Sequence, residues 1–594
     1  MSAQPSIAPS EADQVAPAGA AGVADAKASF LKHIEKRVKS GKYKSSKNLD
    51  NKKLVVTLRR ALKCFKRMEY PEAISLSMEA TKIDAESLQA HQILAMSLEA
   101  VGELNKAISV YQRTIELDPT DADSYLNLGL LAWKMKMYEV SEKFFRIFLT
   151  MKPESSSGVI NLAGTLRDQG RLEDAVDLLK MELFKKPEEH ELWNSLGTVV
   201  MEQGKYEEAV TFYEETLRLK PDYARGYHNM GYTVHHLGKT QEAHDCYSEG
   251  LKLMGKSPDQ VESLHGRALT RLELGDLEGG FREWEVRNDP LFRSSMQMPF
   301  DAEYWIDQDV RGKKLLVMGE QGIGDEIAFA NAIPDLIKHV GPEGKVFIAV
   351  DKRLVDLLQR SFPEAIVDTH TSITHNSRLV RFCPWINDHG GCDYYVTMGS
   401  TLPHFRKKIE DFPVGADFMV PEPRKVAHFR AELEKLGPGP YVGVCWKSMS
   451  VLGNRAKYYS PMEQWGPILR NKDATFVNLQ YGDCQEQIDE AQELYGVKIH
   501  QMDLDLKDDL DTNAALCQAL DLTISAPTAA AAISASVGTE TWFVTIGKVW
   551  PMLGTDHFPW YAKTRVFYPE EYANWKENMT TTGAALEEFV AARS

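Results

Sequence analysis

A glycine-rich loop with three carboxylates is the part of the sequence whose residue types and spacing best suit catalysis. It covers residues 319–326 (GEQGIGDE) and follows an apolar stretch. Glycines after a strand let a ligand approach the backbone, and the helix that follows offers unpaired N–H groups in its first turn. We predict that Asp325 takes the proton of an acceptor hydroxyl as a general base, and that Gly322 and Gly324 contact a donor. The spacing fits equally well an alternative in which Asp325 only caps the helix.

An alanine-rich segment later in the chain offers a second binding loop. Residues 525–532 (SAPTAAAA) follow an apolar strand and begin a helix of small residues. Ser525, Thr528 and the N–H group of Ala529 can form a cradle for a nucleotide phosphate, because the N-terminus of a helix favours negative charge. The alternative is that the alanines only pack the helix tightly against a sheet.

A basic segment with two serines forms the third candidate loop. Residues 447–457 (KSMSVLGNRAK) contain three cations after a strand. Lys447 and Ser448 are predicted to stabilise a departing phosphate, and an exposed basic loop is the alternative. Gln480 and Tyr481 end another strand at the same expected sheet edge, so we also assign them to donor binding.

Short apolar strands that alternate with helical stretches must position these loops. This alternation predicts parallel sheets with helices on both faces and ligands at the carboxyl ends of the strands. We predict two Rossmann-like domains, at 313–415 and 440–594, joined by a linker at 416–439. The strands are expected at 315–319, 345–350, 393–399, 441–446, 475–480, 521–526 and 541–546.

The first half of the chain is organised by prolines that recur every 34 residues, namely Pro119, Pro153, Pro187 and Pro221. Small residues follow at fixed distances after each of them. Proline ends a helix, and small residues let two helices approach closely, so each unit is predicted to be a helical hairpin. Hairpins stack into a solenoid with a concave groove, because one hairpin cannot bury its own apolar face. We place this array at 50–287, with a last unit that is off register by three residues.

Polar residues outside the repeat pattern are the candidates for contacts with a bound protein. Asn127, Asn161 and Asn194 are 34 and 33 residues apart, and His228 lies in the next unit. Side chains at these places can line the groove and hydrogen-bond the backbone of an extended peptide. A solvated surface is the alternative.

Composition and charge narrow the class of protein. The 594 residues carry a net charge of −16, which does not favour binding to nucleic acid or to an anionic membrane, and no run of 18 apolar residues suggests a membrane span. The seven cysteines include no CxxC pair and suit a reducing cytoplasm, where we expect the protein. The sequence contains no set of His, Cys, Asp or Glu residues at the spacing of a metal site, so we predict no metal ion. A homo-oligomer is compatible with the sequence.

Three segments lie outside the repeats and the sheets. Residues 1–26 are predicted to be disordered, because they are rich in Ala, Pro, Ser and Asp and show no periodicity. Residues 27–49 begin a basic lead-in, which is either a solvated helix or a surface for an acidic partner. Residues 288–312 are predicted to form an irregular joint between the array and the first sheet.

These motifs resemble a known combination of domains. The repeats resemble the tetratricopeptide repeat (TPR) family. The second half is similar to the transferase half of bacterial repeat-containing proteins, to the heptosyltransferase family and, more distantly, to the protein O-GlcNAc transferases. That resemblance implies the GT-B fold, two Rossmann-like domains with a sugar-nucleotide donor in the cleft and no other cofactor. The residues that carry it are 319–330, 446–448 (WKS), 478–483 (NLQYGD), 511–532 and 558–567 (FPWYAKTRVF).

The whole combination looks most like the bacterial flagellin-modifying glycosyltransferases. The resemblance implies that the repeats dock flagellin and that the second half transfers a pseudaminic acid-type nonulosonic acid from its CMP-activated form to Ser or Thr. Asp325 matches the Gly-Asp base of heptosyltransferases, and Lys447 matches a lysine of their second domain. Pro527 and Ala532 stand where heptosyltransferases have Asp and His, which favours a different sugar nucleotide. The alternatives are a catalytically inactive fold that serves as an adaptor or chaperone, and a transferase that uses UDP-GlcNAc.

Overall fold

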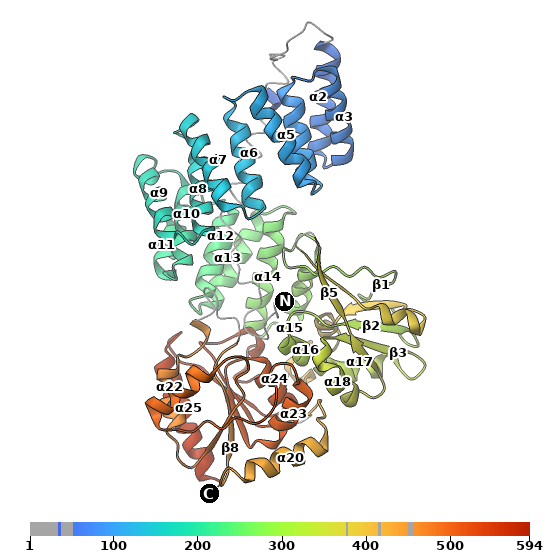
Figure 1. The fold of residues 1–594 in the computed structure, drawn as a ribbon, viewed down its shortest axis with the longest axis vertical. Helices are drawn as coiled ribbons and strands as arrows, with labels where there is room; N and C mark the ends of the chain where they lie inside the picture. Colours follow the sequence, from blue (N-terminus) through green and yellow to red (C-terminus); the bar gives the residue numbers. More distant parts are fainter. Residues whose placement is uncertain (1–33, 37–50, 376–377, 414–416, 449–456, 594) are drawn as a thin grey trace. The chain divides into compact units, whose positions relative to one another are not determined.

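The computed structural model describes residues 34–36, 51–375, 378–413, 417–448 and 457–593 (Figure 1). The segment 1–26, predicted to be disordered, and all but 34–36 of the basic lead-in 27–49 lie outside these residues. Contacts within the chain divide it between Thr233 and Val234 into two compact units.

Helical hairpins make up the first unit, and consecutive helices pack against each other. From α4 to α11, each hairpin joins a helix of 13 residues to one of 14. The second helix of four hairpins ends two residues before one of the recurring prolines, which cannot continue the hydrogen-bond ladder. The helices are α2 (Asn51–Lys66), α3 (Tyr70–Ile83), α4 (Leu88–Ala100), α5 (Leu104–Leu117), α6 (Ala122–Lys134), α7 (Tyr138–Met151), α8 (Ser156–Asp168), α9 (Leu172–Lys185), α10 (His190–Glu202), α11 (Tyr206–Leu219) and α12 (Ala224–His235).

Aromatic rings fill the space that the small residues leave inside the hairpins. Tyr111, Phe145 and Tyr213 occupy the same place in their repeats, and each is at most 1% exposed. A Cβ atom on Gly129 would lie 2.6 Å from the Phe145 ring, and one on Gly197 would lie 2.8 Å from the Tyr213 ring. Glycine on the first helix is therefore needed because the second helix inserts a ring against its backbone.

The turn inside each hairpin contains one residue in the left-handed conformation. Glycine adopts this conformation without steric cost, whereas Met68 and Lys136 adopt it against the preference of residues with a Cβ atom. The turn residue of the last unit is Gly275, which follows Gly238 by 37 residues instead of 34. This confirms the three-residue offset predicted for that unit. The left-handed turn residues at intervals of 34 are Met68, Gly102, Lys136, Gly170, Gly204 and Gly238.

The second unit begins with the remaining helices and continues into a parallel sheet of order β1-β7-β2-β3-β4. The chain order reverses between β2 and β7. Strand β1 lies in the segment 288–312 that was predicted to be irregular, and it has two residues only, too few for a periodic signal. The elements are α13 (Thr240–Leu253), α14 (Pro258–Glu273), α15 (Leu277–Trp284), η2 (Glu285–Asn288), β1 (Glu303–Tyr304), β2 (Lys314–Met318), α16 (Ile323–Phe329), α17 (Ile333–Val340), β3 (Lys345–Val350), α18 (Val355–Ser361), β4 (Ile366–Thr369), the antiparallel pair β5 (Thr371–His375) and β6 (Arg378–Phe382), β7 (Tyr394–Thr397), η6 (Met398–Thr401) and α19 (Leu402–Phe405).

A second parallel sheet follows, with the order β12-β11-β10-β8-β9. Each of the seven predicted strands overlaps a strand of the two sheets, and the predicted parallel pairing is confirmed. Helix α20 lies within the predicted linker 416–439 and packs against α23. The elements are α20 (Pro423–Glu434), β8 (Tyr441–Cys445), α21 (Gly466–Leu469), β9 (Thr475–Asn478), α22 (Gln485–Tyr495), α23 (Leu510–Ala519), β10 (Leu522–Ser525), α24 (Ala529–Ser536), β11 (Thr541–Val544), β12 (Thr564–Phe567) and α25 (Trp575–Ala591).

Candidate functional site

The carboxyl ends of β8, β9 and β10 bring three of the predicted loops together. Strand β8 lies between β9 and β10, and the chain order reverses between β8 and β10. Loops that leave such a reversal turn to opposite faces of the sheet and open a crevice, where open α/β sheets bind their ligands. Lys447 and Ser448 follow β8, Gln480 and Tyr481 follow β9, and Thr528 follows β10. The topology therefore gathers these predicted residues at one edge.

Gln480 ties the first two loops together. Its Oε1 atom accepts hydrogen bonds from the N–H groups of Trp446 (3.1 Å) and Lys447 (3.0 Å), and its Nε2 atom donates to the carbonyl oxygen of Tyr481 (3.2 Å). The Tyr481 hydroxyl donates to Ser448 Oγ across 3.4 Å. Gln480 is 2% exposed and its amide is engaged in these bonds, so its observed contacts shape the crevice.

The third loop is held by its own hydroxyl groups. Ser525 Oγ donates to the carbonyl of Ala526 (2.6 Å), and Thr528 Oγ1 caps α24 by accepting from the N–H of Ala531 (3.4 Å). Ala529 is half-buried at the first position of that helix. The first N–H groups of a helix have no partner inside it and carry partial positive charge. This end of α24 therefore has the character of an anion site.

Lys447 supplies a cation beside these groups. Its side chain is half-buried, and no carboxylate among the described residues forms an ion pair with it. A lysine in the loop after β8, next to the loop that begins α24, is suited to a phosphate, which it binds by charge. Residues 449–456, which include most of the predicted basic segment, lie outside the described part of the chain.

Asp325 lies in the first turn of α16, where its side chain closes the glycine-rich loop. Its Oδ2 atom accepts the N–H of Gly322 at 3.0 Å, and the residue is 5% exposed. Burial raises the pKa of Asp325 to about 8; the hydrogen bond from Gly322 opposes this, and the charges of Glu320 and Glu326 add to it. The carboxyl is thus largely protonated at neutral pH and becomes a base as the pH rises through 8. Gly324, beside it, is buried in the same turn.

A tyrosine from the second half of the unit lies within electrostatic reach of Asp325. Tyr561 is 4% exposed, and its ring stacks on Phe418 and Phe543. Its hydroxyl has no hydrogen-bond partner among the described residues, and its pKa is raised by burial and further by Asp325. A buried hydroxyl left without a partner costs about 1–3 kcal/mol, so a polar ligand group here would be stabilised. Helices α16 and α24 pack against each other (Figure 1), so loops from both sheets contribute to this region.

The carboxyl ends of the first sheet are closed by the chain itself. Arg287, from η2, is 5% exposed and forms two hydrogen bonds with the Glu320 carboxylate, of 2.8 Å and 3.0 Å. It also donates to Thr397 Oγ1 at the end of β7 (3.1 Å) and to Ser400 Oγ (2.8 Å). The sequence did not indicate this cluster, because the guanidinium and the carboxylate are 33 residues apart and belong to different predicted domains.

The residues predicted to line the groove are buried between helices. Asn127, Asn161 and Asn194 are each at most 2% exposed, and His228 is 8% exposed. Asn194 Oδ1 accepts a hydrogen bond from Asn229 Nδ2 (2.9 Å). Both amide atoms of Asn161 and the Oδ1 atom of Asn127 are buried without a partner among the described residues. Asn229 was not among the predicted residues, although it lies 102 residues, or three repeats of 34, after Asn127 and is in register with it. Asn194 lies one residue before the corresponding position, 195.

Two kinds of feature are absent from the described part of the chain. Within residues 34–36, 51–375, 378–413, 417–448 and 457–593, no three or more His, Cys, Asp or Glu side chains come together in a way that could hold a metal ion. No helix in these ranges has the length and apolar character needed to cross a membrane.

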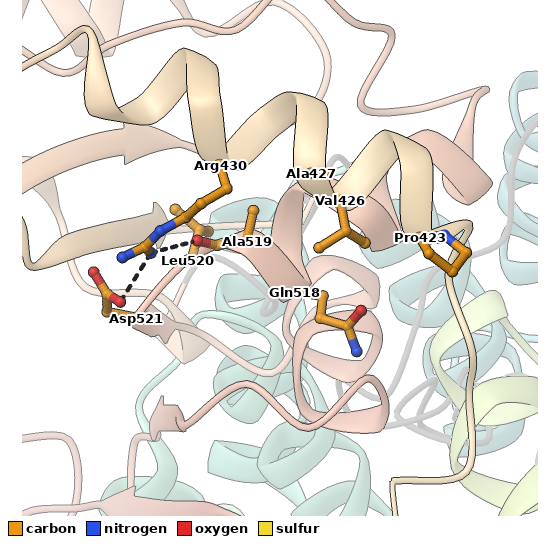
Figure 2. A pocket seen from close by; sticks show the side chains of 8 residues that line it. All are labelled: Pro423, Val426, Ala427, Arg430, Gln518, Ala519, Leu520 and Asp521. Atoms are coloured by element: carbon orange, nitrogen blue, oxygen red, sulfur yellow. Dashed lines mark hydrogen bonds and ion pairs between the residues drawn. The ribbon is translucent and has the colours of Figure 1, made fainter.

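A hollow of about 480 Å³ lies at the opposite edge of the second sheet, between α20 and the end of α23 (Figure 2). Asp521, just before β10, accepts hydrogen bonds there from the N–H of Tyr441 (2.8 Å) and from Arg430 (3.0 Å). These residues stand at the amino ends of the strands, away from the crevice. Their charges are already paired, so the hollow offers little to a ligand.

Two family models match segments of the helical repeats. A family model described as TPR repeat matches residues 100–136 and 197–238, and one described as tetratricopeptide repeat matches 122–155. Among solved structures, pilF of Pseudomonas aeruginosa is 19% identical, with a TM-score of 0.28, over 35% of this chain and 93% of its own. TTC0263 of Thermus thermophilus is likewise 19% identical, with a TM-score of 0.27, over 30% of this chain and 98% of its own.

The class of protein follows from the repeat matches and the two sheets: it is a TPR protein whose second unit contains two parallel sheets. Protein FlbA of Caulobacter vibrioides is 36% identical to this chain over 548 residues, which cover 92% of this chain and 91% of FlbA. The chain therefore belongs to the FlbA family.

Proposed function

We propose that this chain is a GT-B glycosyltransferase that transfers a sugar from a nucleotide donor to Ser or Thr of a protein bound by its helical repeats. The crevice at the carboxyl ends of β8, β9 and β10 carries this proposal. Its strand order has one reversal, between β8 and β10; Lys447 and Ser448 follow β8, and Thr528 follows β10. Three loops with a cation, hydroxyl groups and a helix N-terminus suit a nucleotide phosphate.

The donor side of the reaction is assigned to the second sheet. The N–H groups at the start of α24 and the Lys447 ammonium stabilise the phosphate that departs with the nucleotide. Ser448 and Tyr481 contact the donor from the β8 and β9 loops. CMP, the nucleotide implied by the resemblance to flagellin-modifying transferases, carries one phosphate and needs fewer charged contacts than a diphosphate. The donor proposed is thus a CMP-activated nonulosonic acid of the pseudaminic acid type.

The acceptor side is assigned to Asp325 and its neighbour Tyr561. With its raised pKa, the Asp325 carboxylate is a stronger base than an exposed aspartate and accepts the proton of the attacking hydroxyl. The unpartnered Tyr561 hydroxyl can hydrogen-bond the acceptor oxygen and orient it. The sugar–phosphate bond breaks as the acceptor oxygen bonds to the anomeric carbon, and the nucleotide leaves with the bonding electrons.

The acceptor protein is proposed to be flagellin, bound by the helical repeats in the cytoplasm. The buried side-chain amide of Asn161, neither atom of which has a partner among the described residues, and the unpaired Oδ1 atom of Asn127 support a peptide-binding role for this part of the array. The Asn161 amide can both donate to and accept from a peptide backbone, whereas Asn127 offers only its Oδ1 atom as an acceptor, because its Nδ2 atom donates to the Asp123 carbonyl oxygen. The cost of leaving them unpaired in the free protein is recovered when a peptide binds.

A nucleotide screen tests the crevice without knowledge of the sugar. We expect CMP to raise the thermal unfolding temperature of the full chain and to bind measurably in calorimetry. The matched variant Lys447→Met should weaken binding by about tenfold, because it loses one charge-assisted contact. Arg565→Met serves as the control, since Arg565 is exposed on β12, where its guanidinium stacks on the rings of Trp542 and Phe567.

The screen also separates the alternatives. Stabilisation by UDP but not by CMP would support a UDP-GlcNAc-dependent transferase. No binding of CMP, UDP or ADP by well-folded protein would contradict the enzyme and favour an adaptor or chaperone with an inactive fold.

A further inference from the structure

We infer that Arg287, at the end of the last helical hairpin, is a positioning residue for the loop that carries Asp325. The inference rests on the proposed function, because that function gives Asp325 its role as the base. The contacts of Arg287 described below are independent of it. Arg287 reaches the point where the chain order of the first sheet reverses, between β2 and β7. In open α/β sheets that place is usually left for a ligand. Here a guanidinium from the helical part of the chain fills it.

The guanidinium of Arg287 is hydrogen-bonded to two carboxylates and stacks on an aromatic ring. Two parallel hydrogen bonds join it to Glu320, a third bond joins it to Glu285 (2.9 Å), and its Cζ atom lies 3.7 Å from the centre of the Trp284 ring. The planar fork of arginine suits this geometry, and lysine cannot reproduce it. The Glu320 carboxylate also accepts the N–H of Gly399 (2.7 Å), so Arg287 links both loops of the reversal.

Glu320 and Trp284 pack closely against the backbone of Gly399. A Cβ atom on Gly399 would lie 2.7 Å from Glu320 Oε1 and 2.8 Å from the Trp284 ring. Both partners of the ion pair are 5% exposed, so a change at one of them leaves a buried charge unpaired.

The same short segment also contacts the far end of helix α16. Glu320 precedes α16 and binds Arg287, while Phe329 ends α16 and packs edge-on against Trp284 at a ring distance of 5.6 Å. Asp325 lies between these two points. Residues 284–287 therefore hold both ends of the element whose first turn carries the candidate base. Their effect on transfer is to place Asp325, and they do not touch the reacting atoms.

Trp284 extends this support to the second half of the unit. Its ring lies 6.1 Å from the ring of Trp550, which in turn lies 5.9 Å from that of Trp560. Asn331, just after α16, donates to the carbonyl of Trp560 (2.9 Å). The end of the last hairpin thus belongs to the packed centre of the α/β part, and the Arg287 guanidinium lies at the switch point of the first sheet.

The test combines hydrogen exchange with transfer kinetics in the full chain. Arg287→Met and the pair Arg287→Met/Glu320→Gln are compared with the wild type. The double variant removes both charges of the buried Arg287–Glu320 pair, and Glu285, which it also frees, is one-third exposed, so the variant remains informative if the single variant folds poorly. Arg282→Met is the matched control, because Arg282 lies on α15, the helix just before η2, and its side chain is 76% exposed.

We expect amide exchange in residues 319–326 to be about tenfold faster in both Arg287 variants and unchanged in the control. We expect kcat for sugar transfer to fall about tenfold or more, because the base is misplaced. KM for donor and acceptor should change little, because binding remains. Wild-type exchange rates in the double variant would overturn the inference. If the wild type itself transfers no sugar, the proposed function fails, and the exchange result still decides whether Arg287 positions the loop.

Discussion

The substitution Asp325→Asn tests whether the candidate base is a buried carboxyl with a raised pKa. Asparagine keeps an oxygen that can accept the N–H of Gly322, so the helix cap is preserved while the titrating group is lost. The folded carboxyl has a pKa of about 8, raised by burial from 3.8. An unfolded carboxyl ionises near pH 4, so between about pH 4 and 8 the folded chain holds one more proton than the unfolded chain.

The sign and size of the effect follow from this difference. Each pH unit in that window lowers the free energy of unfolding of the wild type by about 1.4 kcal/mol relative to Asp325→Asn, and the decline ends above pH 8. Between about pH 6.5 and pH 8, which avoids the isoelectric region, the expected relative loss is about 2 kcal/mol.

Urea unfolding of both proteins at several pH values, followed by tryptophan fluorescence, measures this loss. Trp284 and Trp560, which contact Phe329 of α16, are two of the eleven tryptophans that give the signal. Free energies of unfolding that run parallel with pH would refute the reasoning, because they would show a carboxyl with an ordinary pKa. In that case Asp325 is only a helix cap. If Asp325 is the base, kcat/KM of the wild type should also rise with pH up to about 8.

Three further outcomes are expected. Thr528→Val should remove the cap of α24, cost about 1 kcal/mol in the free energy of unfolding and weaken CMP binding in calorimetry, whereas unchanged CMP affinity would exclude this helix end from the site. Asn161→Leu should leave thermal stability equal or higher, since its amide atoms are unpaired, but raise KM for the acceptor protein; an unchanged KM would remove Asn161 from the binding surface. Gly129→Ala should lower the unfolding free energy of the first unit by about 1–3 kcal/mol, because its Cβ atom meets the ring of Phe145, and calorimetric scanning with an unchanged transition would contradict that packing.

Periodic features of this fold were predictable from the sequence. Intervals of 34 residues located the hairpins, and apolar runs located the strands, because stacked repeats and buried parallel strands impose regular patterns on the chain. The two-residue strand β1 gave no signal, since pairing with β7 needs only backbone groups.

The candidate site was predictable only in part. Loops that follow parallel strands must meet at one sheet edge, so Lys447, Ser448 and Thr528 could be grouped in advance. The cluster around Arg287 and Glu320 could not be foreseen, because it depends on how the last hairpin packs on the first sheet. The choice of His228 rather than Asn229 arose from a one-residue slip in the repeat register, because His228 is 34 residues after Asn194, which itself lies one residue before the register position 195. The hydrogen bond between Asn229 and Asn194 resolves what spacing alone does not.

Transfer to an acceptor protein is the most direct test of the central claim. Purified protein is incubated with flagellin and CMP-pseudaminic acid, and the intact mass of flagellin is measured. We predict a mass increase of one or more sugar units, strongly reduced with Asp325→Asn. An unchanged flagellin mass with folded, CMP-binding wild-type protein, or an undiminished increase with Asp325→Asn, would contradict it.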